Sequence, residues 1–178
     1  MTKPLILCLS SFGNAGQLAG EALVAGRDPV SALPSHHLLP CAGASPSGAL
    51  LTALGVFENV PYEGESATLI LQRTPTLPGH AQAFADQMSA LITSKYQNHP
   101  VLIFGSCDRA VSPDPTTRVS RSKTFSSPIP ISLPKLEPPF QEDQGTVVLQ
   151  GGGSSAKVFN TLVKTGHPTA IIVQFTSE

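Results

Sequence analysis

The chain has 178 residues, a formal net charge of −1 at neutral pH, and charged side chains at only 13% of its positions. A balance this close to zero provides no field to attract nucleic acid or an anionic membrane, so neither is expected as a partner. The length fits one domain over residues 1–178, and no apolar run reaches the ~18 residues that cross a bilayer.

The cysteines are odd in number and widely spaced: Cys8, Cys41 and Cys107. None forms a C-x-x-C pair, and a secreted disulfide framework would need an even set. We therefore expect a reducing compartment, cytoplasmic and possibly nuclear.

The first predicted unit is a strand, a turn and a helix. Residues 5–9 are continuously apolar, which is typical of a strand covered on both faces. Small and apolar residues then recur at helical spacing over residues 15–23. Asn14 is placed to cap this helix, with Gln17 completing a capping box, and Gly26 predicts its end.

The middle of the chain predicts a hairpin and a second helix. Residues 34–48 read as a loop with a short possible strand at 37–39, and residues 53–60 and 67–72 as two antiparallel strands joined by a turn. The longest helical pattern covers residues 81–95, and residues 101–104 form another apolar strand.

Seven prolines make residues 111–144 different from the rest, because each removes a backbone donor and disfavours helix at the preceding residue. We expect an extended or mobile loop there. Phe125 and Phe140 lie in this loop. Two interpretations stay open for them: contact with a partner, or packing of the loop over its own sheet edge.

The end of the chain repeats the first pattern. A strand at residues 146–149 is followed by Gly151–Gly153, a helix capped by Ser154 or Ser155 that runs to about Lys164, and a strand at residues 169–175. Apolar strands that alternate with amphipathic helices predict an α/β fold. We expect a single domain with a mostly parallel sheet flanked by helices, plus the β-hairpin.

Two glycine-bearing turns could bind an anion. Gly13, Gly16 and Gly20 follow a strand, but their G-x-x-G-x-x-x-G spacing is not the G-x-G-x-x-G of a dinucleotide site, and it suits close helix packing better. Gly151–Gly153 could cradle an anion or simply permit a tight turn, and we favour the structural role.

Cys107 is the best nucleophile candidate, because it follows a strand end, yet no histidine has a sequence position that places it as the base. Together with Gly151–Gly153 it supports an alternative, a small α/β hydrolase or nucleoside-binding enzyme. His36, His37 and Cys41 form the one metal-like cluster, which lacks the fourth ligand of a zinc site. No catalytic residue, metal or cofactor is therefore expected.

Two segments resemble the proteasome assembly chaperone 2 family. Ser11-Phe12-Gly13-Asn14-Ala15-Gly16-Gln17-Leu18-Ala19 is similar to a signature near the start of that family. The closing Val173-Gln174-Phe175-Thr176-Ser177-Glu178, after three glycines and a capped helix, resembles the family's last strand.

The resemblance implies a non-enzymatic assembly factor with a three-layer fold akin to purine nucleoside phosphorylases. Such a protein pairs with a second assembly chaperone as a heterodimer and promotes formation of the α-subunit ring of the proteasome core particle. The family-motif residues would shape two strand-to-helix turns: Gly13, Asn14, Gly16, Gln17, Leu18, Gly151, Gly152 and Gly153. The family's C-terminal hydrophobic-tyrosine tail is not present, so its mode of ring contact is not carried over.

Overall fold

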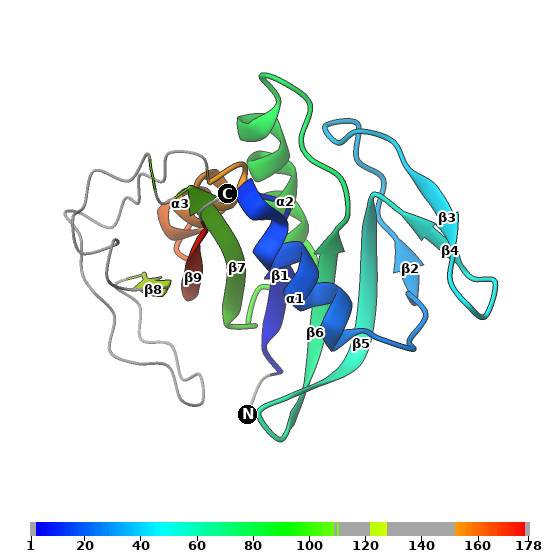
Figure 1. The fold of residues 1–178 in the computed structure, drawn as a ribbon. Coiled ribbons are helices and arrows are strands. Elements are labelled where there is room, and N and C mark those ends of the chain that lie inside the picture. Colours follow the sequence, from blue (N-terminus) through cyan, green and yellow to red (C-terminus); the bar gives the residue numbers. More distant parts are fainter. Residues whose placement is uncertain (1–2, 109, 111–121, 128–151, 177–178) are drawn as a thin grey trace.

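The computed structural model describes residues 3–108, 110, 122–127 and 152–176. A seven-stranded sheet in the order β2-β5-β6-β1-β7-β9-β8 forms the centre of the molecule (Figure 1). Its strands are β1 (Leu5–Cys8), β2 (Ser31–Ala32), β5 (Leu54–Tyr62), β6 (Glu65–Gln72), β7 (Val101–Asp108), β8 (Ser122–Ser126) and β9 (Thr169–Thr176). A separate two-stranded sheet pairs β3 (Ala42–Ala44) with β4 (Leu50–Thr52).

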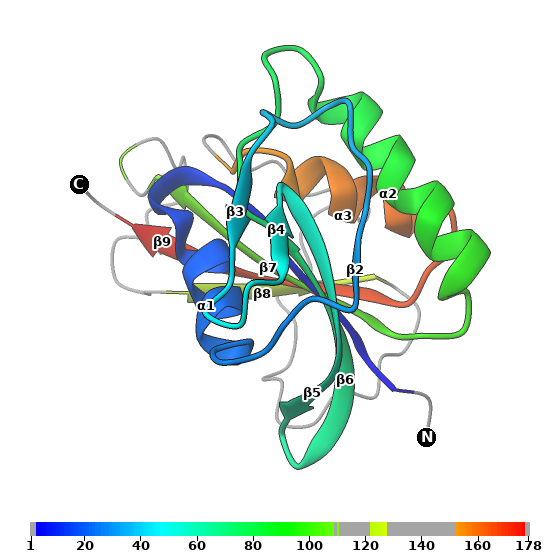
Figure 2. The ribbon, with the colours of Figure 1, turned by 90° about the vertical axis from the view of Figure 1, so that its right-hand side faces the viewer.

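The four central strands, β6, β1, β7 and β9, run parallel, whereas β2, β5 and β8 are antiparallel to their neighbours. Parallel neighbours need long crossover connections, and the helices supply them. Helix α1 (Ala15–Leu23) covers one face of the sheet, and α2 (Ala81–Lys95) and α3 (Ser155–Lys164) cover the other (Figures 1 and 2). The predicted single α/β domain with a mostly parallel sheet and a hairpin is thus confirmed.

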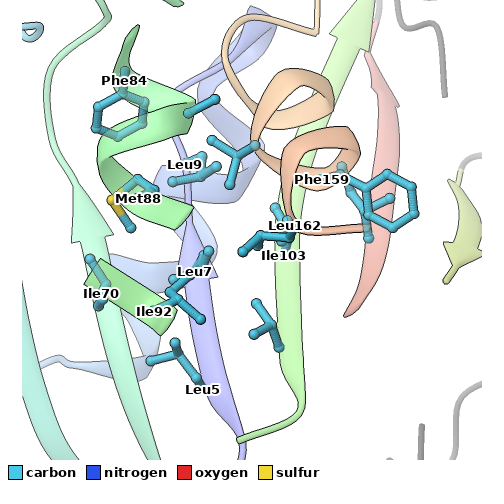
Figure 3. Close-up of a cluster of buried hydrophobic side chains, with 14 of the residues drawn as sticks. Leu5, Leu7, Leu9, Ile70, Phe84, Met88, Ile92, Ile103, Phe159 and Leu162 are labelled. Carbon is cyan, nitrogen blue, oxygen red and sulfur yellow. The ribbon is translucent and has the colours of Figure 1, made fainter. Parts of the chain in front are cut away.

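Strand β1 contributes side chains to the hydrophobic clusters on both faces of the sheet, because successive side chains of a strand point to opposite faces. Leu5, Leu7 and Leu9 pack with residues of α2 and α3 (Figure 3). Ile6 and Cys8 belong to a second buried cluster on the face that α1 covers. A strand buried on both faces has to be continuously apolar, which is the pattern that predicted it.

Three helices match the predicted ranges, and left-handed glycines follow two of them, Gly26 (φ 72°) and Gly166 (φ 78°). Such glycines end helices because they lack the Cβ that disfavours a positive φ. The predicted hairpin is also confirmed, as β5 and β6 pair antiparallel around Glu63 and Gly64.

Three sequence predictions were wrong. Strand β7 continues past Phe104 to Asp108, paired with β9 throughout, so Cys107 lies in a strand and not in a turn. Part of the predicted proline-rich loop, Ser122–Ser126, is β8, an edge strand added antiparallel to β9. The remainder of residues 111–144, and the strand predicted at 146–149, lie outside the described residues.

The third error concerns residues 34–48, which contain β3 and were predicted as a loop. The predicted strand at 37–39 is a single bridge between Leu38 and Thr76. Strands β2, β3 and β4 have two or three residues each, too few for alternation to appear in a sequence.

Gly20 lets α1 lie directly on the sheet. A Cβ at this position would stand 2.6 Å from Cβ of Cys8 and 2.7 Å from Cδ1 of Leu71, closer than carbon atoms can approach. The expectation that these small residues serve helix packing is supported, since Gly16 and Gly20 are the buried residues of α1.

We predict that Gly20→Ala lowers the free energy of unfolding by about 1–3 kcal/mol, the usual cost of overpacking, even though alanine is the better helix former. Urea unfolding followed by circular dichroism measures this change. Leu18→Ala is the control, because the Leu18 side chain is 63% exposed and its removal should change stability by less than about 0.5 kcal/mol. Equal stability of the Gly20 variant and the wild type would contradict the close packing.

Candidate functional site

The residues of the first family motif form the corner between β1 and α1, at the carboxyl end of β1. A single 3-10 turn, Phe12–Asn14, joins the strand to the helix. Gly13 and Asn14 both have left-handed backbone conformations, with φ of 68° and 50°. A Cβ on Gly13 would stand 2.7 Å from Oγ1 of Thr176, so only glycine fits between this turn and the end of β9.

Asn14 does not cap α1 in the predicted way. Its side chain makes no hydrogen bond to the first turn of the helix, and no capping box with Gln17 forms. Instead, Oδ1 of Asn14 accepts a hydrogen bond of 3.2 Å from the Ser10 hydroxyl. The tertiary structure imposes the left-handed conformation, which asparagine tolerates better than most residues.

Ser106 of β7 serves the start of α1 in place of a cap. Its buried Oγ accepts the backbone N–H of Ala15 at 3.3 Å and donates to the carbonyl oxygen of Phe12. Since the hydroxyl has one proton, the 2.7 Å contact between the two serine hydroxyls is donated by Ser11. The backbone N–H of Ser106 in turn donates to Ser11 Oγ at 2.7 Å. Strand β7 thereby holds the whole corner in one conformation.

Gly16 is required where α1 crosses the strand ends. A Cβ there would stand 2.7 Å from the carbonyl oxygen of Leu9 and 2.9 Å from the carbonyl carbon of Phe104. Both neighbours are backbone atoms of the sheet, which cannot move aside as a flexible side chain can. A Cβ at either motif glycine, Gly13 or Gly16, would thus clash with neighbouring atoms, and the role of these residues in shaping the turn belongs to the proposed function.

The second glycine-bearing corner meets the first. Gly153, with φ of 58°, precedes α3, and a Cβ there would stand 3.0 Å from the carbonyl oxygen of Ser10. Gly152 is buried, and its carbonyl accepts a 2.6 Å hydrogen bond from the Ser155 hydroxyl. Ser154 occupies the N-cap position of α3 without a side-chain capping bond. Gly151 lies outside the described residues.

Gln72 ties both corners to the end of β6. Its fully buried side chain accepts hydrogen bonds from the backbone N–H of Ser10 at 3.3 Å and from the Ser154 hydroxyl at 3.4 Å. Its amide group donates to the carbonyl of Thr74 at 2.7 Å. Nothing in the sequence marked Gln72 as part of this site, because its partners come from segments 62 and 82 residues away.

A polar pocket of about 390 Å³ opens between the two corners. It lies at the carboxyl ends of parallel strands, where open α/β sheets gather their ligands. Its walls come from both corners and from the segment after β6: Ser10, Ser11, Phe12, Asn14, Gln17, Arg73, Pro75, Thr76 and Gly153. The one cation among these lining residues, Arg73, pairs with Glu21 of α1 at 2.9 Å.

Cys107 is not a nucleophile in this arrangement. Its side chain is 2% exposed, and burial, with a smaller effect of Asp108, raises the pKa of its thiol to about 11. Four of the five histidines bond elsewhere, His37 to His80, His99 to the carbonyl of Lys3 and His167 to Thr93, and His36 is exposed in the segment between β2 and β3. A catalytic thiol needs a lowered pKa and an adjacent base, and Cys107 has neither among the described residues.

The metal-like cluster of His36, His37 and Cys41 noted in the sequence does not form in the structure. His37 faces His80, with 3.2 Å between their Nδ1 atoms, and is not grouped with His36 and Cys41. Within the described part of the chain no three His, Cys, Asp or Glu residues are placed to hold a metal ion. Over the same residues, no helix is long and apolar enough to span a membrane.

The two aromatic candidates for partner contact have different outcomes. Phe125 of β8 is 5% exposed and belongs to the main hydrophobic cluster, so the structure supports the packing of this segment on its own sheet edge. Burial removes Phe125 as a contact residue in this conformation. Phe140 lies outside the described residues.

We predict that Asn14→Ser lowers the free energy of unfolding by about 1–2 kcal/mol, because serine tolerates the left-handed conformation less well. Asn14→Gly should leave stability within about 0.5 kcal/mol of the wild type. Thermal and urea unfolding of the two variants measure the difference. A helix-capping role for Asn14 would give the opposite order, since serine caps helices as well as asparagine does.

We predict one fast-reacting thiol in the native protein. Cys41 is exposed, whereas burial raises the pKa of Cys8 to about 12 and that of Cys107 to about 11. Labelling with a chromogenic disulfide at pH 7.5 should therefore show one fast equivalent, which Cys41→Ser removes, and two more on denaturation. A second fast equivalent assigned to Cys107 by mass spectrometry would restore it as a nucleophile.

No family model matches the sequence, and no curated protein sequence matches it significantly. The fold, in contrast, has clear relatives among solved structures. A PAC2 family protein from Streptomyces avermitilis superposes with a TM-score of 0.53 at 13% identity, over 98% of this chain and 76% of that one. A proteasome-assembly chaperone homologue from Mycobacterium tuberculosis has a TM-score of 0.52 at 12% identity, over 98% and 75%.

PbaB from Pyrococcus furiosus, an archaeal proteasome activator, superposes with a TM-score of 0.55 at 13% identity, over 99% of this chain and 76% of that one. At such identities the likeness establishes the fold. The resemblance expected from the two sequence motifs is confirmed at that level: this chain has the fold shared by a PAC2 family protein, a proteasome-assembly chaperone homologue and a proteasome activator.

Proposed function

We propose that this chain is a proteasome assembly chaperone subunit that acts by binding and not by catalysis. The observation that carries the proposal is the fold likeness over 98–99% of the chain to proteins described as a proteasome-assembly chaperone homologue and a proteasome activator. Of the two segments that suggested the family, the first forms the corner between β1 and α1, and the described part of the second runs from the corner before α3 to the end of β9.

In this proposal the chain pairs with a second assembly chaperone of similar fold, and the heterodimer promotes formation of the α-subunit ring of the core particle. In this proposal, assembly of the ring takes place in the cytoplasm and the nucleus. Binding of this kind needs a surface of constant shape, since ordering a flexible surface would subtract from the affinity. The hydrogen bonds of Ser106 and Gln72 provide such rigidity at the two corners.

We assign structural roles to the motif residues. Gly13, Gly16 and Gly153 permit backbone approaches that a Cβ would block, and Asn14 supplies a left-handed turn. Gln17 and Leu18 lie on the solvent side of α1, with Gln17 at the rim of the pocket. None of these side chains performs chemistry in the proposed function.

The polar pocket favours a second candidate function, the binding of a small polar ligand such as a nucleoside. Its place at the carboxyl end of β1 is where such ligands bind in open α/β sheets. The buried Cys107 thiol, with its raised pKa, argues against a hydrolase that uses this cysteine. Thermal shift with nucleosides and with phosphate separates the candidates, because a stabilising ligand raises the melting temperature.

We expect affinity capture of the tagged chain from an extract of its own cells to recover a second assembly chaperone together with α-type subunits of the proteasome core particle. Mass spectrometry identifies the bound chains, and an unrelated protein with the same tag is the control. Recovery of the chain without any proteasome-related protein, combined with a nucleoside-dependent thermal shift, would replace the proposed function with the second candidate.

A further inference from the structure

Residues 29–57, here called the uncharged arm, contain no Asp, Glu, Lys or Arg. This is the longest uncharged stretch of the chain, and at the chain-wide share of 13% about four charged residues would be expected in it. The uncharged arm carries β2, β3, β4 and the start of β5. An uncharged stretch is ordinary in a buried core and unusual on a surface, so the exposure of these residues has to be examined.

The two-stranded sheet of the uncharged arm, β3 and β4, lies at the end of the seven-stranded sheet opposite β8, next to the edge strand β2 (Figures 1 and 2), whereas Leu54, Val56 and Phe57 of β5 are buried. Fifteen of the 29 residues of the uncharged arm are exposed. It holds three of the four large hydrophobic side chains that the described residues expose: Val30 at 59%, Leu39 at 42% and Leu50 at 62%. Depletion of charge with exposure of apolar side chains is the composition of the centre of an interface.

The uncharged arm is nevertheless held in place without a partner. The Ser45 and Ser47 hydroxyls each donate a 2.6 Å hydrogen bond to the Asp28 carboxylate at its base. Arg73 donates to the carbonyl of Thr52 at 3.4 Å, so β4 is the strand that faces the body of the protein. Strand β3 is left as the outer edge.

The free edge of β3 carries unpaired backbone groups. The hydrogen bond from the N–H of Ser45 to the carbonyl of Ala49 sets the alternation of the hairpin, in which Gly43 bonds to Leu51. Ala42 and Ala44 therefore direct their N–H and C=O groups away from β4, and among the described residues neither group has a partner there. Natural edge strands usually carry lysine, proline or a bulge to prevent pairing, and Ala42–Ala44 has none of these.

The part of the chain that the structure describes does not explain Gly43 in the middle of this edge. A Cβ added there would meet nothing within 4 Å, and the backbone is not in the left-handed region. Glycine inside a strand costs stability and often marks a close approach of another backbone. The approaching backbone is therefore to be sought beyond the described residues.

We propose that a second copy of this chain binds here, with the two β3 strands paired antiparallel around a two-fold axis at Gly43. In that register Ala42 of each copy faces Ala44 of the other and exchanges both backbone hydrogen bonds, while the two Gly43 residues form the close, non-hydrogen-bonded pair. Two identical patches without charge do not repel one another. In a dimer with a two-fold axis, the same patch of each copy forms the interface. The inference does not rest on the proposed function.

The first test is the mass of the purified full chain, measured by light scattering after size exclusion over a range of concentrations. The wild type should approach twice the 18.6 kDa of one chain. Leu50→Lys places a charge on β4 opposite Ala44, beside the contact, and Ala44→Pro removes an outward N–H without touching the bonds of the hairpin, so each should raise the dissociation constant at least about tenfold. Leu18→Lys is the matched control, because Leu18 on α1 is as exposed as Leu50 but lies outside the uncharged arm.

The second test is a disulfide across the two-fold axis. In a Cys41→Ser background, Gly43→Cys should give a covalent dimer under mild oxidation, since the ~4.5 Å between Cα atoms of a non-hydrogen-bonded pair fits a disulfide. Ala90→Cys, exposed on α2, should give none.

A wild type that stays monomeric at about 100 µM, or a dimer that neither Leu50→Lys nor Ala44→Pro weakens, would overturn the inference. A chain that captures a different assembly chaperone through this surface but never dimerises would overturn it as well and leave the proposed function standing.

Discussion

The start of α1 depends on a hydroxyl that belongs to another strand. Ser106 of β7 accepts the first helical N–H, donates to Phe12 and bonds to Ser11, all from a fully buried position. Because Ser106 itself is fully buried, the loss of its partners would leave its hydroxyl and its backbone N–H without access to water. This one residue therefore links the order of the sheet to the direction in which the helix leaves it, and Gln72 extends the link to β6 and α3.

The hydrogen bonds that hold the two corners also occupy polar groups of the pocket. The pocket at the carboxyl end of β1 has the location of a ligand site in an α/β sheet, but its polar groups are largely engaged in holding the two corners together. Cys107 lies nearby in β7 with its thiol buried and its pKa raised. The hydrogen bonds of Ser106 and Gln72 thus fix the shape of this region, which is the property that the proposed function requires of it.

The proposed pairing of two copies rests on the lack of charged residues over residues 29–57. Fifteen of these 29 residues are exposed, the open edge of β3 among them, and the second copy in our proposal would cover that edge. The two regions lie in different parts of the fold, the corners at the strand ends and the β3 edge at the end of the sheet opposite β8. The proposed function and the proposed pairing of two copies therefore make use of different parts of the fold.

The sequence by itself determined the α/β class, the buried strands and the three helices. A strand that is buried on both faces needs a continuous apolar run, and a helix that is buried on one face needs apolar residues at helical spacing. Both patterns are local and can be recognised in the sequence. It also indicated that the glycines of both corners set backbone geometry. Only the tertiary structure decided the conformation of Asn14, the length of β7 and the packing of Phe125, since each depends on a neighbour supplied by a distant segment. The sequence did not indicate the roles of Ser106 and Gln72 either, because hydrogen-bond partners 62 to 95 residues away leave no periodic pattern in the chain.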